Sequence, residues 1–363
     1  MKRLADICDI QYGYAFDSKC FTEDSSYPQL VRIRDVKRGY SETYYSGNYP
    51  EEYILSEGDL LIGMDGEFNI ARWKCSGALL NQRVCKLTTK VGTNEEYLRF
   101  AMLKSLKEIE QRTAFVTVKH LSAKELNKLE LDVPELTKQD KIADTLSRLE
   151  RVIEARKEEL EKLDELIKAR FVEMFGDLAN PECSWDKSKL IDVCTDKDDI
   201  KCGPFGTQLN KDEYIESGIA VWEIPQINAA FLINPTHFLT EEKAEQLKAY
   251  TIIPGDIAMS RKGNVGKCAL FPDNYPEGII HSDVLRIRVD RKRINPLFMM
   301  CQLHFSGSVT RQIELVSSGA IMAGVNVTKL KQIYVHVPPI ELQNQFADFV
   351  HQVDKSKVIK LSN

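Results

Sequence analysis

The sequence predicts a mixed α/β (α+β) fold, with two similar domains that are each followed by a long helix. Two observations carry this prediction. Several short segments occur twice in the same order, and a highly charged segment in the middle of the chain has the apolar spacing of a coiled coil. With 363 residues, the chain is long enough for two or three domains that each bury a core. We therefore expect a pseudo-two-fold internal repeat.

The repeated segments keep their order along both halves of the chain. Three segments are found twice: 4–8 and 190–194, 55–60 and 253–257, and 126–134 and 330–338. The third segment runs on in each half to a glutamine, Gln139 or Gln343, and then into a helical pattern. Such a duplication suggests a protein that holds two similar objects at a fixed separation.

The first half alternates short strand patterns with turns. Residues 29–36 alternate apolar and polar side chains, which predicts a half-buried strand. Residues 59–63 and 83–87 are apolar runs that predict two more strands, and residues 95–113 have helical spacing. We place the first domain at residues 1–138.

The segment from Gln139 to about Phe175 has the clearest helical pattern in the chain. Its seam positions are spaced alternately three and four apart, which is typical of a heptad seam, and they are apolar except for Arg156 and Arg170. The main seam residues are Leu146, Leu149, Ile153, Leu160, Leu163 and Ile167. A helix of about 37 residues would be roughly 55 Å long. We therefore expect a stiff spacer over residues 139–177.

The second half repeats the plan of the first. Residues 220–224 and 284–289 predict strands, and residues 296–313 predict the helix that corresponds to 95–113. We place the second domain at residues 184–340 and a second, shorter spacer helix at residues 341–363. That helix has apolar positions at heptad-like spacing.

Composition excludes several classes of protein. A hydrophobic share of 43% and a charged share of 28% are typical of a globular protein, and the sequence contains no run of 18 apolar residues. We therefore expect no membrane association. The nine cysteines form no Cys-x-x-Cys pair, which indicates reduced thiols and a cytoplasmic protein. A net charge of -5 argues against indiscriminate nucleic-acid binding, although residues 281–331 are locally basic.

Basic and amide side chains in both halves are candidates for DNA contacts. Arginine pairs with guanine edges, asparagine and glutamine with adenine, and lysine with phosphate. The candidates are Arg32, Arg34, Lys37, Arg38, Lys201, Gln208, Arg261, Lys262, Asn264, Lys267, Arg286 and Arg288. Alternation would place Arg286 and Arg288 on one face of a strand, as a groove-facing surface requires. For any one loop residue, a solvated charge is about as probable as a contact.

Other features have simpler structural interpretations. Gly58-Asp59 and Gly255-Asp256 are expected to be turns, with glycine at positive φ and aspartate bonded to the backbone. Phe16 and Phe205 are expected to be buried. In the acidic loop that follows the 59–63 strand, Asp65 and Glu67 could accept from cytosine amino groups, but solvated turns are favoured.

Enzymatic readings are weak. The six histidines show no metal-ligand spacing, so we expect no metal site and no catalytic residue. Asp273 with Asp290 and Lys292 fits a loose, degenerate nuclease pattern. A stand-alone metal-dependent nuclease and a coiled-coil adaptor that does not bind nucleic acid therefore stay as alternatives.

The order and spacing of these parts resemble those of the specificity subunit of type I restriction–modification enzymes. The resemblance covers almost the whole chain. It depends on the repeated segments that lead to Gln139 and Gln343 and on the long helix that ends near residues 169–177. The family usually has a second helix comparable to the first, whereas the second helix here is about half as long.

The resemblance implies a function that composition cannot give. Each domain would be a target-recognition domain that reads one half of a bipartite duplex DNA target. The helices would act as a ruler and would dock methyltransferase and restriction subunits. The chain itself would be a non-catalytic, cytoplasmic subunit without a cofactor, and S-adenosylmethionine, ATP and Mg²⁺ would be bound by the partner subunits.

Overall fold

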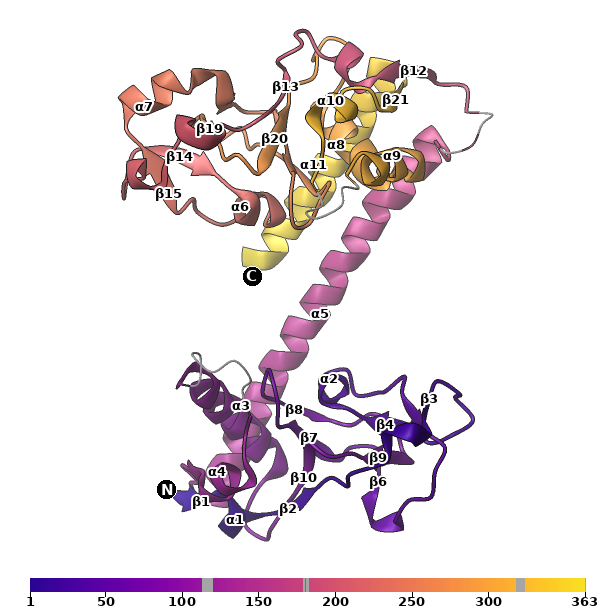
Figure 1. Ribbon diagram of the computed structural model, residues 1–363, viewed down its shortest axis with the longest axis vertical. Helices are drawn as coiled ribbons and strands as arrows, with labels where there is room; N and C mark the ends of the chain where they lie inside the picture. Colours follow the sequence, from indigo (N-terminus) through magenta and orange to yellow (C-terminus); the bar gives the residue numbers. More distant parts are fainter. Residues whose placement is uncertain (113–119, 179, 181–182, 318–323, 363) are drawn as a thin grey trace. The chain divides into compact units, whose positions relative to one another are not determined.

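The fold consists of two compact units, Met1–Arg156 and Lys157–Asn363 (Figure 1). The computed structural model describes residues 1–112, 120–178, 180, 183–317 and 324–362. Strands and helices alternate in both units, so the predicted mixed α/β class and the two-domain repeat are confirmed. No helix among the described residues is long and apolar enough to span a membrane.

The first unit is built on an antiparallel sheet with strand order β2-β10-β7-β8. Its strands are β2 (Cys8–Tyr12), β10 (Val84–Thr89), β7 (Leu60–Gly63) and β8 (Asn69–Arg72). A second sheet has the order β4 (Leu30–Val31), β9 (Ala78–Leu80) and β6 (Ile54–Leu55). Two short pairs complete the unit: β1 (Lys2–Arg3) with β11 (Glu130–Leu131), and β3 (Phe21–Thr22) with β5 (Tyr44–Tyr45).

Helices pack around this sheet, which has apolar residues on both faces. They are α1 (Leu4–Ile7), α2 (Ile33–Val36), α3 (Glu95–Arg112), α4 (Ala123–Lys128) and the first part of α5 (Leu136–Phe175). The main core joins strand residues such as Leu60 and Ile62 to Leu98 and Met102 of α3. All four side chains are removed from water, which is the main favourable contribution to folding.

The second unit repeats this order of strands. Its main sheet has the order β13 (Ile200–Cys202), β20 (Val284–Ile287), β17 (Ile257–Ser260) and β18 (Cys268–Leu270). The second sheet has the order β15 (His237–Leu239), β14 (Ile219–Trp222), β19 (Gly278–Ile280) and β16 (Thr251–Ile252). The terminal pair is β12 (Asp186–Lys189) with β21 (Tyr334–Val337). These three sheets therefore keep the strand order of their counterparts in the first unit, with β15 added at one edge, whereas the β3–β5 pair of the first unit has no counterpart among them.

The second unit also contains α-helices, which except for α7 have counterparts in the first. They are α6 (Ile224–Asn228), α7 (Glu241–Gln246), α8 (Pro296–Phe305), α9 (Gly307–Ser317), α10 (Val327–Leu330) and α11 (Ile340–Ser362). The single helix expected over residues 296–313 is divided, because α8 ends at Phe305 and α9 starts at Gly307. The pair α8 and α9 occupies the place in the repeat that α3 has in the first unit.

The strand expected over residues 29–36 is only partly present. Leu30–Val31 forms β4, but Ile33–Val36 forms the short helix α2. The side chain of the buried Asp35 accepts a hydrogen bond of 3.0 Å from the backbone N–H of Arg32, which satisfies a donor at the start of the helix. This local polar contact outweighs the alternating pattern.

A buried glutamine fixes the chain at the start of the long helix in each unit. Gln139 donates to the carbonyl groups of Gly92 and Pro134 at 3.1 and 2.7 Å and accepts from the N–H of Asn94 at 2.9 Å. Gln343 makes the same three contacts, with the carbonyl groups of Arg293 and Pro338 and the N–H of Asn295. Both side chains are buried, and we call this arrangement the glutamine lock.

The C-terminal part of α5 packs on α11 within the second unit. Ile167, Phe171 and Phe175 share a core with residues of α8 and with Phe346 and Val350 of α11. The ring centroids of Phe171 and Phe346 are 5.5 Å apart, and Asp164 accepts from Lys357 at 2.7 Å. Helix packing of this kind agrees with the expected coiled-coil spacer.

The Gly-Asp pairs form turns, as the sequence predicts. Gly58 and Gly255 have φ values of 91° and 82°, a region that residues with a Cβ rarely adopt. Asp59 accepts from the N–H of Ser56, and Asp256 accepts from the N–H of Ile253. These residues therefore have a structural role.

Candidate nucleic-acid interface

The loops that follow β7 and β17 are equivalent, and each lies at one end of the main sheet of its unit. In the first unit, Met64 follows β7, donates to the carbonyl of Arg83 at 2.9 Å and accepts from Leu121 at 2.7 Å. In the second unit, Arg261 follows β17, donates to the carbonyl of Asp283 at 2.8 Å and accepts from Val325 at 3.0 Å. These shared backbone bonds make Asp65 equivalent to Lys262, and Arg83 equivalent to Asp283.

The candidate cations of the first unit lie on and around α2. Arg32, Arg34, Lys37 and Arg38 are all exposed. Their ion pairs are long: Lys37 is 3.5 Å from Glu67 and Arg38 is 3.9 Å from Glu42, and both pairs are exposed to water. Exposed pairs of this kind contribute little stability, so Lys37 and Arg38 can exchange these partners for phosphate.

Arg32 and Arg34 also line a hollow of about 690 Å³ beside β3 and β5. Its other lining residues are Phe21, Thr22, Glu23, Glu42, Thr43 and Tyr44. The two arginines give this concave surface two positive charges, which Glu23 and Glu42 balance.

The structure brings together three residues that sequence reasoning did not select as a group. Nε of Arg83 lies 3.6 Å from Oδ2 of Asp65, and Nδ1 of His120 contacts Oδ1 of the same carboxylate. Nη1 of Arg83 lies 3.2 Å from Nδ1 of His120. Arg83 stands at the start of a predicted strand, and His120 belongs to no motif, so no sequence pattern indicates this cluster.

The second unit gathers four candidates on the loop after β17. Arg261 lies over the ring of Phe205, with its guanidinium carbon 4.8 Å from the ring centroid. Lys262 forms an ion pair of 2.8 Å with Asp283. Asn264 is exposed and Lys267 is partly buried on the same loop. Phe205 is 46% exposed, so the expectation that it is buried is wrong, whereas Phe16 is buried as expected.

Lys201 and Gln208 meet around one tyrosine. Nζ of Lys201 lies 5.4 Å from the ring centroid of Tyr250 and 3.7 Å from a carboxylate oxygen of Asp198. Tyr250 donates its hydroxyl hydrogen to Oε1 of Gln208 at 3.0 Å. Oε1 of Gln208 also accepts from the N–H of Phe205 at 3.2 Å, which joins this group to the aromatic ring under Arg261.

Arg286 and Arg288 do not form the exposed face that alternation suggested. Arg286 is 5% exposed and donates to the carbonyl groups of Thr251 and Asp198 at 2.6 and 2.8 Å. Burial lowers the pKa of its guanidinium, and the neighbouring Arg288 lowers it further. Arg288 binds the fully buried Asp256 through bonds of 2.8 and 2.7 Å. Strand alternation identifies a face, but it does not say whether other elements cover that face.

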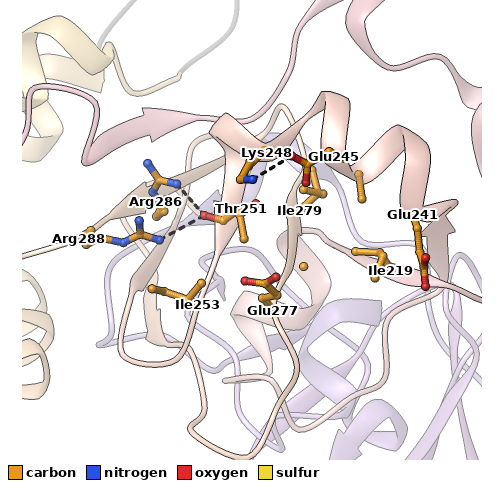
Figure 2. A pocket seen from close by; sticks show the side chains of 12 residues that line it. Ile219, Glu241, Glu245, Lys248, Thr251, Ile253, Glu277, Ile279, Arg286 and Arg288 are labelled. Carbon is orange, nitrogen blue, oxygen red and sulfur yellow. Dashed lines mark hydrogen bonds and ion pairs between the residues drawn. The ribbon is translucent and has the colours of Figure 1, made fainter.

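Figure 2 shows these two arginines at one side of a pocket of about 410 Å³. Both guanidinium groups point to the carbonyl oxygen of Thr251, and the ion pair of Lys248 with Glu245 is drawn beside this residue. Glu241 and Glu277 add two more carboxylates. The mixture of charges and the internal pairing make this pocket a poor site for the DNA backbone.

The seam of α5 is buried at one end and exposed along its middle. Ile167 is buried and Leu163 packs against the core of the second unit, whereas Leu146 and Leu160 are partly buried. Leu149 and Ile153 are 54% and 46% exposed, and Val152 beside them is 56% exposed. These three residues form an apolar surface on the helix, which we call the mid-helix patch.

The features that first suggested catalysis have structural roles. The described residues contain no group of three or more His, Cys, Asp and Glu side chains that could hold a metal ion. Nε2 of His304 accepts from the N–H of Cys268 at 2.8 Å, and burial lowers the pKa of His304 from 6.5 to about 4. Oδ1 of Asp290 accepts from the N–H of Lys292. The nuclease alternative therefore finds no support.

Two comparisons with known proteins cover both units. The family model described as "Type I restriction modification DNA specificity domain" matches residues 1–165 and again residues 183–362. The chain is 30% identical to the type I restriction enzyme EcoBI specificity subunit of Escherichia coli, over 96% of this chain and 78% of that protein.

A solved structure has the same fold. It is the type I restriction–modification system S subunit from M. genitalium, which matches with a TM-score of 0.58 at 16% identity. The match covers 99% of this chain and 90% of that chain. Two copies of the family domain, a relative matched over nearly the whole chain and the shared fold lead to one conclusion. The chain belongs to the family of type I restriction–modification specificity subunits, which supply DNA sequence specificity and are not themselves catalytic.

Proposed function

We propose that this chain reads a bipartite duplex DNA target, with one half-site bound by each unit. The observation that carries this proposal is a repeated frame with different side chains at equivalent exposed positions. Strand order and the glutamine lock are the same in both units. The loops after β7 and β17 differ in charge, since Asp65 stands where the second unit has Lys262. Two units with the same fold but different exposed side chains suit two half-sites of different sequence.

The mechanism would be positioning. Exposed cations such as Arg34, Lys37 and Arg38 would hold phosphates and set the register, and loop residues such as Arg261 and Asn264 would read base edges. Arg32 would also hold a phosphate. In the second unit, DNA would further contact Lys262, Lys267, Lys201 and Gln208. Arg286 and Arg288 would support the second unit from inside and would not touch DNA.

We propose that α5 sets the number of base pairs between the half-sites. It is one continuous helix of 40 residues that begins at the glutamine lock of the first unit and ends in the aromatic core of the second. A helix gains 1.5 Å per residue, so a heptad adds about 10 Å, which corresponds to about three base pairs of B-DNA.

Partner subunits would supply the chemistry. Methyltransferase and restriction subunits would bind S-adenosylmethionine, ATP and Mg²⁺, and this chain would bind none of them. The mid-helix patch is a candidate docking surface for the methyltransferase subunit, because Leu149, Val152 and Ile153 leave apolar area exposed between charged neighbours.

The test is a heptad insertion in α5, between the lock and the aromatic core, at residues 151–157. The chain would be produced with its partner subunits, and the methylated positions in cellular DNA would be mapped. We expect the gap to grow by about three base pairs while both half-sites stay the same. The control keeps Val152 and Ile153 of the mid-helix patch and replaces the other residues of this segment without changing the length, and it should leave the gap unchanged. An unchanged gap in the insertion variant would refute the role of α5.

A further inference from the structure

We propose that Arg83 reads a guanine in the half-site bound by the first unit, with Asp65 as the residue that positions it. This inference rests on the proposed function and assigns a reading residue to it. Among the described residues, three that are not glycine have positive φ, and Arg83, at 72°, is one of them. Backbone of this kind costs energy and is found preferentially at functional positions.

The side chain of Arg83 is held and yet accessible. Its Nε faces Asp65 at 3.6 Å, and its Nη1 faces His120 at 3.2 Å. The Arg83 side chain is still 52% exposed, while that of Asp65 is only 24% exposed. The carboxylate therefore lies behind the guanidinium and limits its rotation. An arginine that is fixed in advance loses less conformational freedom when it binds.

The surroundings of Arg83 match a DNA surface. Asp65 and Glu67 belong to one loop, and Glu67 lies 3.5 Å from Lys37, which connects the loop to the exposed cations around α2. Phosphate contacts from those cations would bring the loop to a groove, where a base-reading group is needed. An exposed guanidinium fits the O6 and N7 acceptors of guanine through two parallel hydrogen bonds, the commonest specific contact to a base.

The second unit supports the assignment by contrast. Asp283 occupies the place of Arg83, and Lys262 occupies the place of Asp65. The fold therefore accepts either polarity at this position. A pair that only stabilised the fold would have no reason to be exposed at the edge of the candidate interface, and its loss would not alter which DNA is bound.

Arg83→Gly is the most informative variant, because glycine adopts a φ of 72° without strain and the unit should still fold. Arg83→Lys keeps the charge but cannot form two parallel bonds. Asp65→Asn removes the carboxylate charge behind the guanidinium. Arg38→Ala is the control, since this arginine is exposed and outside the cluster. Each chain would be produced with its partner subunits, and its methylation motif would be mapped.

We expect Arg83→Gly to accept other bases at one position where the wild type requires guanine, in the first unit's half-site alone. Arg83→Lys and Asp65→Asn should relax the same position less. Arg38→Ala should lower methylation at all sites equally. In a binding assay with the purified complex, 7-deazaguanine at that position should weaken wild-type binding about tenfold, because the N7 acceptor is lost. The Arg83→Gly complex should bind both duplexes equally.

Three results would overturn the inference: an unchanged motif for folded Arg83→Gly, an equal loss at all sites, or a change in the other half-site. Thermal unfolding of the complex shows whether the glycine variant is folded, and Arg83→Lys decides the question if it is not. A wild-type motif without two separate half-sites would overturn the proposed function itself. A two-part motif that the Arg83 variants leave intact would overturn this inference alone.

Discussion

The first and second units share a frame but present opposite charges at the same place. Arg83 faces Asp65 in the first, and Asp283 faces Lys262 in the second, at positions fixed by the same backbone hydrogen bonds. In contrast, Gln139 and Gln343 make the same three contacts. The interior of a domain must satisfy its buried polar groups, whereas its exposed loops are free to differ. The two units therefore agree in their buried polar contacts and differ in their exposed loops.

The two units also hold α5 in different ways. The second unit uses an aromatic core, in which Phe171 is 1% exposed and lies against Phe298 and Phe346. The first unit uses polar contacts: the glutamine lock, and Arg99, which binds Glu150 with a bond of 3.1 Å from Nη1 to Oε1. This difference leads to the following predictions, ordered from the largest expected effect on stability to the smallest.

The largest effect is expected for Phe171→Ala. Truncation of a fully buried aromatic ring removes apolar contacts and leaves a cavity, at a cost of about 3–5 kcal/mol. Urea unfolding followed by a probe in the second unit would measure this cost. Val172→Ala is the matched control, because Val172 is adjacent and 46% exposed, and it should change stability by less than about 0.5 kcal/mol. Equal costs for the two variants would show that the aromatic core does not hold α5.

Acid should destabilise the second unit before the first. Burial lowers the pKa of His304 to about 4, below its usual value of 6.5, and the neutral ring accepts from the N–H of Cys268. The stabilisation is therefore complete above pH 6.5 and is lost as the pH falls towards 4, by up to about 3 kcal/mol. Burial also lowers the pKa of His336, which acts in the same direction.

The first unit contains one histidine, His120, which is exposed. Hydrogen exchange of the two units at pH 7 and pH 4.5 would separate their stabilities. His304→Gln removes the titrating group, and Oε1 of the new side chain can accept in its place, so the pH dependence of the second unit should decrease. A first unit that opens earlier than the second would contradict this prediction.

The smallest difference in stability between the two units is expected at the glutamine lock, which has the same contacts in both. Gln139→Ala and Gln343→Ala each leave buried backbone groups without partners, at a cost of about 2 kcal/mol. Because the contacts are the same, the two costs should agree within about 0.5 kcal/mol. Gln352→Ala is the control, since Gln352 is exposed on α11 and its loss should have little effect. Clearly unequal costs would show that the two locks are not equivalent.

Most of the fold could be predicted from the sequence, because its signals are local or repeated. Residues 126–134 and 330–338 identified the repeat, and heptad spacing identified α5. The interface was harder to predict. Arg286 is buried by a sheet that no local pattern describes, and Asp65 lies near Arg83 and His120 only after the chain has folded. Residues that are far apart in sequence and have no shared motif give no signal of their proximity.

The glutamine lock has a consequence for how this protein can change over generations. It ties the start of each long helix to the proline just before it, Pro134 or Pro338, and to a segment of the same unit that lies 45 to 50 residues earlier in the chain. A gene exchange with a crossover at this point would bring in a new reading unit and leave the helix in phase. New DNA preferences would then arise in one recombination event, without the slow accumulation of compensating mutations.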